Sequence, residues 1–233
     1  MEVRRSELKF YLSDYQYKVM SERLKKILPK DPYNKTGKGY FIRSLYFDSV
    51  DNKAFWEKEA GIMYRKKYRM RIYDLDTKKV KFEIKNKANN QIFKETATIS
   101  RDDAMQVQQG NYEVLLNYNN KILNKIYYEF KKQKYQPVVV VDYIREPYVL
   151  PFNRIRITFD RHLKSNNSCF NIFKKDLMLK SYLKPGVTIL EIKYDGFLPI
   201  WVKNVLQIEQ FERSAISKYC NGRMETNQTY LSI

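Results

Sequence analysis

The chain of 233 residues is poor in the side chains on which many enzymes and metal sites depend. It has one histidine, His162, and two cysteines, Cys169 and Cys220. A single histidine argues against a histidine zinc site and against a Ser-His-Asp triad. The cysteines have neither metal-ligand spacing nor a disulfide framework, so we expect two reduced thiols. Any general base is therefore expected to be a carboxylate, a water or a lysine.

Long apolar runs and glycine-rich phosphate loops are absent as well. No stretch of about 18 apolar residues predicts a transmembrane segment, and the N-terminus lacks the apolar part of a signal peptide. The chain has only 7 glycines and 7 prolines and no GxxxxGK sequence. Phosphate binding would therefore depend on side chains. We predict a single domain, residues 1–233, located in the cytoplasm.

Positive charge is what the chain has in excess. Lysine and arginine number 44 against 26 for aspartate and glutamate, which gives a formal net charge of +18. Hydrophobic residues make up 43% and aromatic residues 15%, enough for a folded core. Such a charge indicates an anionic partner: nucleic acid, a phosphate compound or a membrane surface.

Alternating polar and apolar residues predict about eight strands. The first lies in RRSELKFYL and the last in TILEIKYDG. Between them we predict strands at 40–47, on either side of DLDTKK, at 92–99, at 138–148 and in NRIRITFD. Short turns between most of them favour antiparallel pairing. Helical segments are fewer and are predicted at 14–28, 49–59, 101–109, 119–132, 199–210 and 214–220.

One face of these strands is basic. Its members are Lys9, Arg69, Arg71, Lys85, Lys87, Arg154, Arg156 and Lys193, with Glu7, Glu83 and Glu191 as a minority. Like charges on neighbouring strands repel one another. The pattern therefore favours a bound polyanion that offsets the repulsion. The alternative is an ordinary antiparallel sheet with one solvated face.

Eight antiparallel strands can also close into a barrel. If helices cover outward-facing apolar surfaces, the charged faces line a tunnel, and its carboxylates can hold Mg²⁺ or Mn²⁺ beside phosphate oxygens. Nucleic acid is the competing ligand. Base stacking needs aromatic and basic side chains on one face, whereas Tyr68 and Phe159 fall opposite the basic positions. Nucleic-acid binding by the basic segment 119–132 stays open.

An ordered set of motifs over about residues 4–220 resembles one family. RSELKFYLS, SLYFDSVDNKAFWEK, YRKKYRMRIYD with FEIKNK, VVVVDYIREPY, RITFD, LEIKYDGFLP and SAISKY resemble, in this order, the motifs of VTC (vacuolar transporter chaperone) domains. These belong to the triphosphate tunnel metalloenzymes. The resemblance implies an α+β fold with an eight-stranded antiparallel barrel around a basic tunnel and helices packed outside. It also implies synthesis of inorganic polyphosphate from ATP with Mn²⁺ or Mg²⁺.

The resemblance also implies a set of site residues. Arg69, Arg71, Lys218 and Glu191 match catalytic positions, and Lys58 matches a further basic position. Glu191 resembles the metal carboxylate, with Glu7 as a second candidate. The phosphate-binding set would be Lys9, Arg69, Arg71, Lys85, Lys94, Tyr143, Arg145, Arg156, Lys193 and Lys218.

The N-terminal motif departs from the pattern of related tunnel triphosphatases. Those begin with ExExK, whereas Arg5 replaces the first acid here. The lost carboxylate favours a polymerase over a triphosphatase. A triphosphatase and a non-catalytic polyphosphate-binding module stay open as alternatives. The membrane and regulatory domains of eukaryotic relatives are missing, which predicts a stand-alone bacterial protein.

Overall fold

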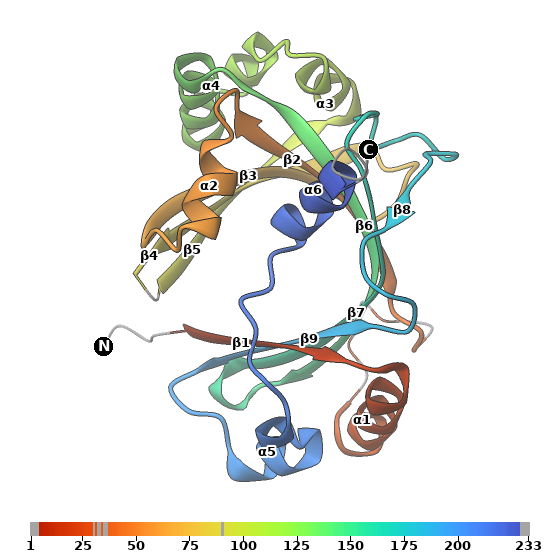
Figure 1. Cartoon of the computed structure of the whole chain (residues 1–233). Coiled ribbons are helices and arrows are strands. Elements are labelled where there is room, and N and C mark those ends of the chain that lie inside the picture. The colour runs from red at the N-terminus through yellow and green to blue at the C-terminus, as the bar shows by residue number, and fades with distance from the viewer. Residues whose placement is uncertain (1–4, 30, 32–33, 35–36, 90, 229–233) are drawn as a thin grey trace. The chain divides into compact units, whose positions relative to one another are not determined.

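The computed structural model describes residues 5–29, 31, 34, 37–89 and 91–228 (Figure 1). Its strands are β1 (Arg5–Leu12), β2 (Tyr40–Ser49), β3 (Tyr64–Ile72), β4 (Lys79–Ala88), β5 (Gln91–Ser100), β6 (Tyr135–Leu150), β7 (Ile155–Asn166), β8 (Lys180–Ser181) and β9 (Thr188–Asp195). Its helices are α1 (Asp14–Ile27), α2 (Lys53–Glu59), α3 (Arg101–Gln108), α4 (Lys121–Gln133), α5 (Ile200–Leu206) and α6 (Lys218–Gln228). Short 3-10 helices lie at Glu113–Tyr118, Phe152–Arg154 and Ile208–Gln210.

The strands follow one path of hydrogen-bonded neighbours, β1-β9-β7-β6-β2-β3-β4-β5, with β8 paired to β7. Every pair whose register is described is antiparallel. The eight long strands are the eight predicted from the sequence, and the two-residue β8 was not predicted. The predicted α+β class with an antiparallel sheet is confirmed.

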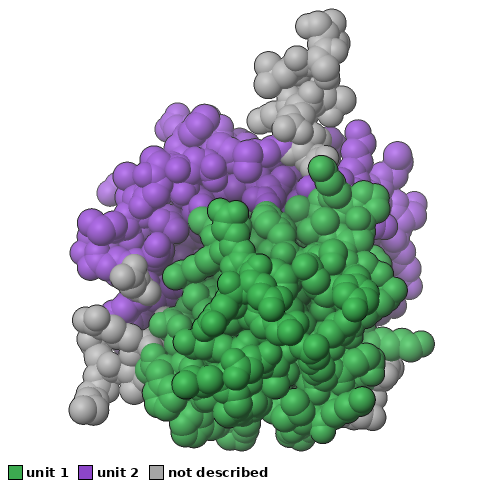
Figure 2. Space-filling model, turned by 60° about the horizontal axis from the view of Figure 1, so that its bottom comes forward, with its two compact units in different colours: residues 1–41, 143–163, 183–217 green, residues 42–142, 164–182, 218–233 purple. Residues whose placement is uncertain are grey.

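The chain divides into two compact units (Figure 2). Unit 1 consists of residues 1–41, 143–163 and 183–217, and unit 2 of residues 42–142, 164–182 and 218–233. Each unit has its own hydrophobic core. The prediction of a single domain stays a prediction.

In unit 1, α1 and α5 cover the apolar face of strands β1, β7 and β9 (Figure 1). Ser13 begins α1 through a capping box, in which its hydroxyl accepts from the Gln16 N–H and the Gln16 side chain accepts from the Ser13 N–H. Since successive strand residues point to opposite faces, the polar residues between the core positions share the other face. The core side chains include Phe10, Met20, Leu24, Ile157, Phe159, Leu190, Ile192, Val202 and Leu206.

In unit 2, an aromatic cluster centred on Phe130 of α4 joins the helices to strands β3 and β4. The Phe130 ring stacks on Tyr135 with centroids 4.8 Å apart, and it contacts Tyr68 edge-on at 5.2 Å and Tyr112 at 5.1 Å. Phe130 is fully buried. Tyr68 of β3 and Phe82 of β4, which alternate with basic positions, therefore belong to the core, as the sequence pattern predicted.

The helix predicted at 49–59 is shorter than expected. The Asp48 carboxylate accepts from the backbone N–H groups of Ser49 and Ala54, each at 2.8 Å. Asn52 has a left-handed φ of 55°. This turn occupies the first residues of the predicted helix, so α2 begins only at Lys53.

Two C-terminal helix predictions also need correction. The segment 199–210 is divided at Gln207, whose φ of 49° ends α5 and separates it from a 3-10 turn. The segment 214–220 is helical only from Lys218 onward, and α6 then continues to Gln228. Residues 214–217 are not helical, and the Ser214 N–H donates to the Lys9 carbonyl of β1 at 3.0 Å.

Replacing Phe130 by alanine is expected to lower the free energy of unfolding by about 3–5 kcal/mol, because a cavity replaces a fully packed ring. Tyr128→Ala, on the same helix but 65% exposed, is the control and should change it by less than about 0.5 kcal/mol. Urea denaturation of both variants measures this. Equal losses for the two would contradict the assigned core.

Candidate functional site

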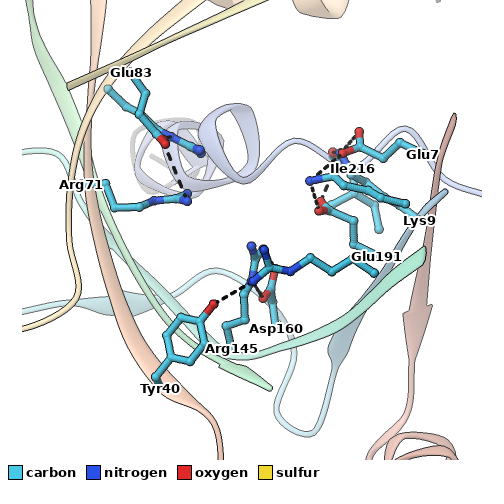
Figure 3. Close-up of polar contacts among 12 residues, drawn as sticks. Glu7, Lys9, Tyr40, Arg71, Glu83, Arg145, Asp160, Glu191 and Ile216 are labelled. Carbon is cyan, nitrogen blue, oxygen red and sulfur yellow. Dashed lines mark hydrogen bonds and ion pairs between the residues drawn. The ribbon is translucent and has the colours of Figure 1, made fainter. Parts of the chain in front are cut away.

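Two lysines and two glutamates form an ion cluster on the polar face of unit 1 (Figure 3). Lys9 Nζ lies 2.9 Å from Glu7 Oε2 and 3.8 Å from Glu191 Oε2. Lys193 Nζ lies 2.5 Å from Glu191 Oε1 and 3.4 Å from Glu7 Oε1. The register of β1 and β9 sets Lys9 opposite Glu191 and Glu7 opposite Lys193. All four residues were predicted as site residues, and the structure brings them together.

Arg145 of β6 is held by a carboxylate that the sequence reasoning did not single out. Its Nε and Nη2 both donate to Asp160 at 2.7 Å, and Asp160 is fully buried. Burial lowers the pKa of Arg145, but the charge and hydrogen bonds of Asp160, together with the nearby Tyr143 and Glu191, outweigh burial and raise that pKa well above its usual value. The guanidinium also lies 5.4 Å from the ring centroid of buried Tyr143. A bidentate pair of this kind fixes the orientation of the arginine.

Arg156 of β7 has a buried donor that the described part of the chain does not satisfy. Its Nη2 donates to the Tyr40 hydroxyl at 3.2 Å, but its Nε is buried and has no hydrogen-bond partner among the described residues. Arg156 also lies directly opposite Lys193 in the β7–β9 register. A buried unsatisfied donor and a like-charge pair are both destabilising. An anion accepting from Arg156 would offset both costs.

In unit 2, three cations surround the single carboxylate of Glu83, and Figure 3 shows one of them, Arg71, turned toward it. Arg69 Nε donates to Glu83 Oε2 at 2.6 Å, and Lys94 Nζ donates to Oε1 at 3.0 Å. Arg71 Nη1 lies 4.0 Å from Oε2, while its Nε donates to Ser44 Oγ at 3.2 Å. Burial raises the pKa of Glu83, but the three positive charges outweigh it and hold the pKa at about 2. We call Arg69, Arg71, Glu83 and Lys94 the Glu83 cluster.

Tyr46 links Lys218 to this cluster electrostatically. The Tyr46 hydroxyl accepts from Arg69 Nη1 at 3.3 Å. Burial raises the pKa of Tyr46, but the charges of Arg69, Arg71 and Lys218 bring it below its usual value. Lys218 is the first residue of α6, and its role as a site residue stays a prediction.

A row of lysines crosses the three neighbouring strands β3, β4 and β5. Lys85 lies opposite Lys67 on one side and opposite Lys94 on the other. Burial, as the largest effect, lowers the pKa of Lys67 to about 8, and the nearby charge of Lys58 adds to the lowering. Lys67 was not predicted as a site residue. Lys58 lies in the last turn of α2.

The sequence reasoning missed two residues that organise the cations. Glu83 and Asp160 were visible as acids within basic strands, yet neither was assigned a role. The available signal was their isolation, since a lone acid among several bases is a natural partner for them. The side chain of Arg5, on which the departure from the triphosphatase motif rests, lies outside the described residues.

The metal that the resemblance implies fits Glu7 and Glu191 under one condition. Carboxylate oxygens suit Mg²⁺ and Mn²⁺, and Mg²⁺ commonly uses one or two carboxylates together with substrate phosphates. The described residues contain no group of three or more His, Cys, Asp or Glu placed for a metal. The two carboxylates already neutralise Lys9 and Lys193. A dication there requires both ammonium groups to turn to other anions, such as phosphate oxygens.

Metal and phosphate binding are therefore expected to be coupled. Tripolyphosphate should raise the melting temperature more with Mn²⁺ than with EDTA, and Glu191→Gln should remove this difference while keeping the rise seen in EDTA. Differential scanning fluorimetry measures both. Glu209→Gln is the control and should keep the difference. A metal-dependent rise that survives in a Glu7→Gln/Glu191→Gln double variant would contradict the assigned metal ligands.

The Glu83 cluster predicts a dependence of stability on pH. The pKa of Glu83 is about 2 in the folded chain, against an ordinary value of 4.5. Its contribution is therefore complete above pH 4.5 and is lost as the pH falls toward 2. Protonation should cost about 3 kcal/mol of unfolding free energy. Denaturation curves taken across this pH range give the unfolding free energy at each pH. Glu83→Gln should reduce the fall of this free energy between pH 4.5 and pH 2, whereas the exposed control Glu59→Gln should not. Parallel curves for wild type and Glu83→Gln would refute the assignment.

A family model described as the VTC domain matches residues 4–226 of the chain. No curated protein matches the chain. Among solved structures, the chain is similar to a protein from Hippeastrum described as a putative adenylyl cyclase with a dominant triphosphatase activity. The identity is 15%, the match covers 97% of this chain and 96% of that one, and the TM-score is 0.57.

Two further solved structures show the same fold. A putative adenylate cyclase from Bacillus halodurans is 13% identical, with 93% of this chain and 95% of that chain covered and a TM-score of 0.50. The PH1819 protein from Pyrococcus horikoshii is 11% identical, with 96% and 99% covered and a TM-score of 0.50. At these identities the likeness shows the fold alone, and the predicted triphosphate tunnel fold is confirmed. Among helices in the described ranges, none combines the length and apolar character needed to cross a bilayer.

Proposed function

We propose that this chain, which belongs to the VTC domain family, is a phosphotransferase that adds the γ-phosphate of ATP to a growing inorganic polyphosphate chain. Membership of the family and the shared fold support a function on triphosphate or polyphosphate. The transfer reaction, ATP as donor and Mn²⁺ or Mg²⁺ as cofactor are our proposal. A cytoplasmic location and a bacterial source stay predictions.

The observation that carries the proposal is the buried, unsatisfied Nε of Arg156 beside a like-charged neighbour, Lys193. The lysine row of unit 2 supports it independently, since Lys85 faces a lysine on each side. If solvent were the only partner of these cations, replacing some of them by neutral residues would increase the stability of the folded chain. Phosphate oxygens accept several hydrogen bonds from converging arginines and lysines, and so offset both costs.

The carboxylates give the cations fixed positions before substrate arrives. Asp160 orients Arg145, and Glu83 orients Arg69 and draws Arg71 and Lys94 toward it. Phosphoryl transfer needs mainly positioning and stabilisation of charge on the equatorial oxygens, which arginine and lysine side chains can supply. These cations would bind the phosphate oxygens and exclude water from them.

Glu191 and Glu7 would hold the divalent metal, which supplies further neutralisation of phosphate charge when bound. Lys9 and Lys193 would then turn from the carboxylates to phosphate oxygens. The acceptor is itself a phosphate chain whose terminal oxygen is already ionised, so no strong general base is needed. The scarcity of histidine agrees with this reaction.

The runner-up function is an inorganic triphosphatase, which the activity named for the Hippeastrum protein favours. Incubating the chain with ATP, tripolyphosphate and Mn²⁺ and recording phosphorus NMR spectra separates the two. Polymer resonances that exopolyphosphatase removes support the proposal, and orthophosphate alone supports the triphosphatase. No product, but a tripolyphosphate-dependent rise in melting temperature, identifies a binding module. Displacement of tripolyphosphate by an oligonucleotide at physiological salt would favour nucleic acid instead.

Substitutions of the assigned site residues are expected to reduce polymer formation. Arg71→Ala in unit 2 and Glu191→Gln in unit 1 should each reduce polymer formation by about 10²-fold or more, the usual cost of losing one group that stabilises transition-state charge. Arg71→Lys keeps the positive charge but loses the planar guanidinium, so its rate of polymer formation should lie between that of wild type and that of Arg71→Ala. Lys18→Ala, which removes an exposed ion pair on α1, is the control. Full activity in Arg71→Ala would refute the assigned role.

A further inference from the structure

Four large apolar side chains of unit 1 are exposed together, away from its polar strand face. The exposed fractions are 53% for Phe152, 62% for Phe197, 73% for Ile200 and 42% for Trp201. The Phe152 and Phe197 rings lie 5.8 Å apart, edge to face. Both rings and Trp201 line one apolar cavity of about 260 Å³, and Ile200 precedes Trp201 in the first turn of α5. We call these four residues the exposed apolar patch.

The local structure holds the patch outward. Phe152 lies at the tip of the β6–β7 hairpin, where Asn153 and Arg154 have left-handed φ values of 49° and 44°. The Asn153 side-chain amide donates to the Phe197 carbonyl at 2.8 Å, which ties this hairpin to the segment between β9 and α5. The patch therefore lies on two loops, the β6–β7 hairpin and the β9–α5 segment, and on the first turn of α5. Clustered exposed apolar groups of this kind indicate an interaction surface.

Basic groups accompany the patch. Arg154, next to Phe152 in the hairpin, has a side chain that is 68% exposed and is paired with the buried carboxylate of Asp195. Phe197 also lines a second cavity, of about 490 Å³, whose charged lining residues are Lys203, Arg213 and Glu209. Cations therefore outnumber anions around Phe197, in keeping with the net charge of +18 for the chain.

We propose that the exposed apolar patch inserts into the surface of a bilayer that contains anionic lipids, with Arg154, Lys203 and Arg213 binding lipid headgroups. Aromatic side chains are favoured at the boundary between headgroups and acyl chains. Apolar groups flanked by basic residues are typical of reversible binding to anionic membranes. Projecting rings at a hairpin tip and a helix start suit shallow insertion, and the positive charge favours this occupant over a neutral protein surface.

Co-sedimentation of the full chain with vesicles tests the proposal. Vesicles of phosphatidylcholine with about one third phosphatidylglycerol should bind it, and vesicles of phosphatidylcholine alone should bind it far less, because headgroup charge contributes to binding. Phe152→Ser/Phe197→Ser should weaken partitioning by about tenfold or more, since two rings no longer insert. Trp56→Ser, at a tryptophan that is 61% exposed in unit 2, is the matched control and should bind like wild type.

Tryptophan fluorescence locates the contact. The chain has two tryptophans, so Trp56→Phe leaves Trp201 as the only reporter. Anionic vesicles should shift its emission to shorter wavelength, and brominated acyl chains should quench it. Trp201→Phe, which leaves Trp56, should show neither effect. Added tripolyphosphate should leave the Trp201 shift in place, since the patch is separate from the phosphate-binding residues.

Several results would overturn the proposal. The first is the absence of binding to anionic vesicles at physiological salt. The second is an equal loss of vesicle binding in Phe152→Ser/Phe197→Ser and in Trp56→Ser. The third is release of the chain from vesicles by tripolyphosphate. An unshifted Trp201 on bound vesicles would also refute insertion. A dimer in sedimentation velocity that Phe152→Ser/Phe197→Ser disrupts in the absence of lipid would assign the patch to a second copy of the chain.

Discussion

Repulsion between like charges on the polar face of the strands is the constraint on which the rest of this structure depends. Lysines and arginines face one another across neighbouring strands, as Lys67, Lys85 and Lys94 do. The strands stay paired because their other faces bury two well-packed cores. Burial of apolar area stabilises each unit enough to tolerate the repulsion. The polyanion that we propose as ligand would offset this repulsion.

The carboxylates on this face have two different tasks. Glu83 and Asp160 are fully buried and hold arginines in fixed orientations. Glu7 and Glu191 share two lysines and can exchange those partners for a metal when phosphate takes the lysines. The first pair organises the cations in advance, which lowers the reorganisation needed during a reaction. In the proposed function, the second pair would make metal binding depend on the anionic ligand.

The two interaction surfaces of unit 1 differ in kind. On the polar strand face, nearly every cation has a described carboxylate or hydroxyl partner, and phosphate is the ligand that we propose. At the β6–β7 hairpin and the start of α5, the exposed groups are rings and an isoleucine flanked by arginine and lysine. Both surfaces draw on the same excess of positive charge, but only the second offers apolar area to a partner.

The sequence by itself determined the eight long strands, their two faces and the identity of the basic residues. These features follow from neighbours two to four positions apart, so local periodicity is enough to predict them. The tertiary structure decided that Glu83 gathers three cations, that Asp160 pairs with Arg145, that α6 begins at Lys218, and that Phe152 meets Phe197. Strand register and packing bring together residues 11 to 45 positions apart, and composition and periodicity do not predict such pairings.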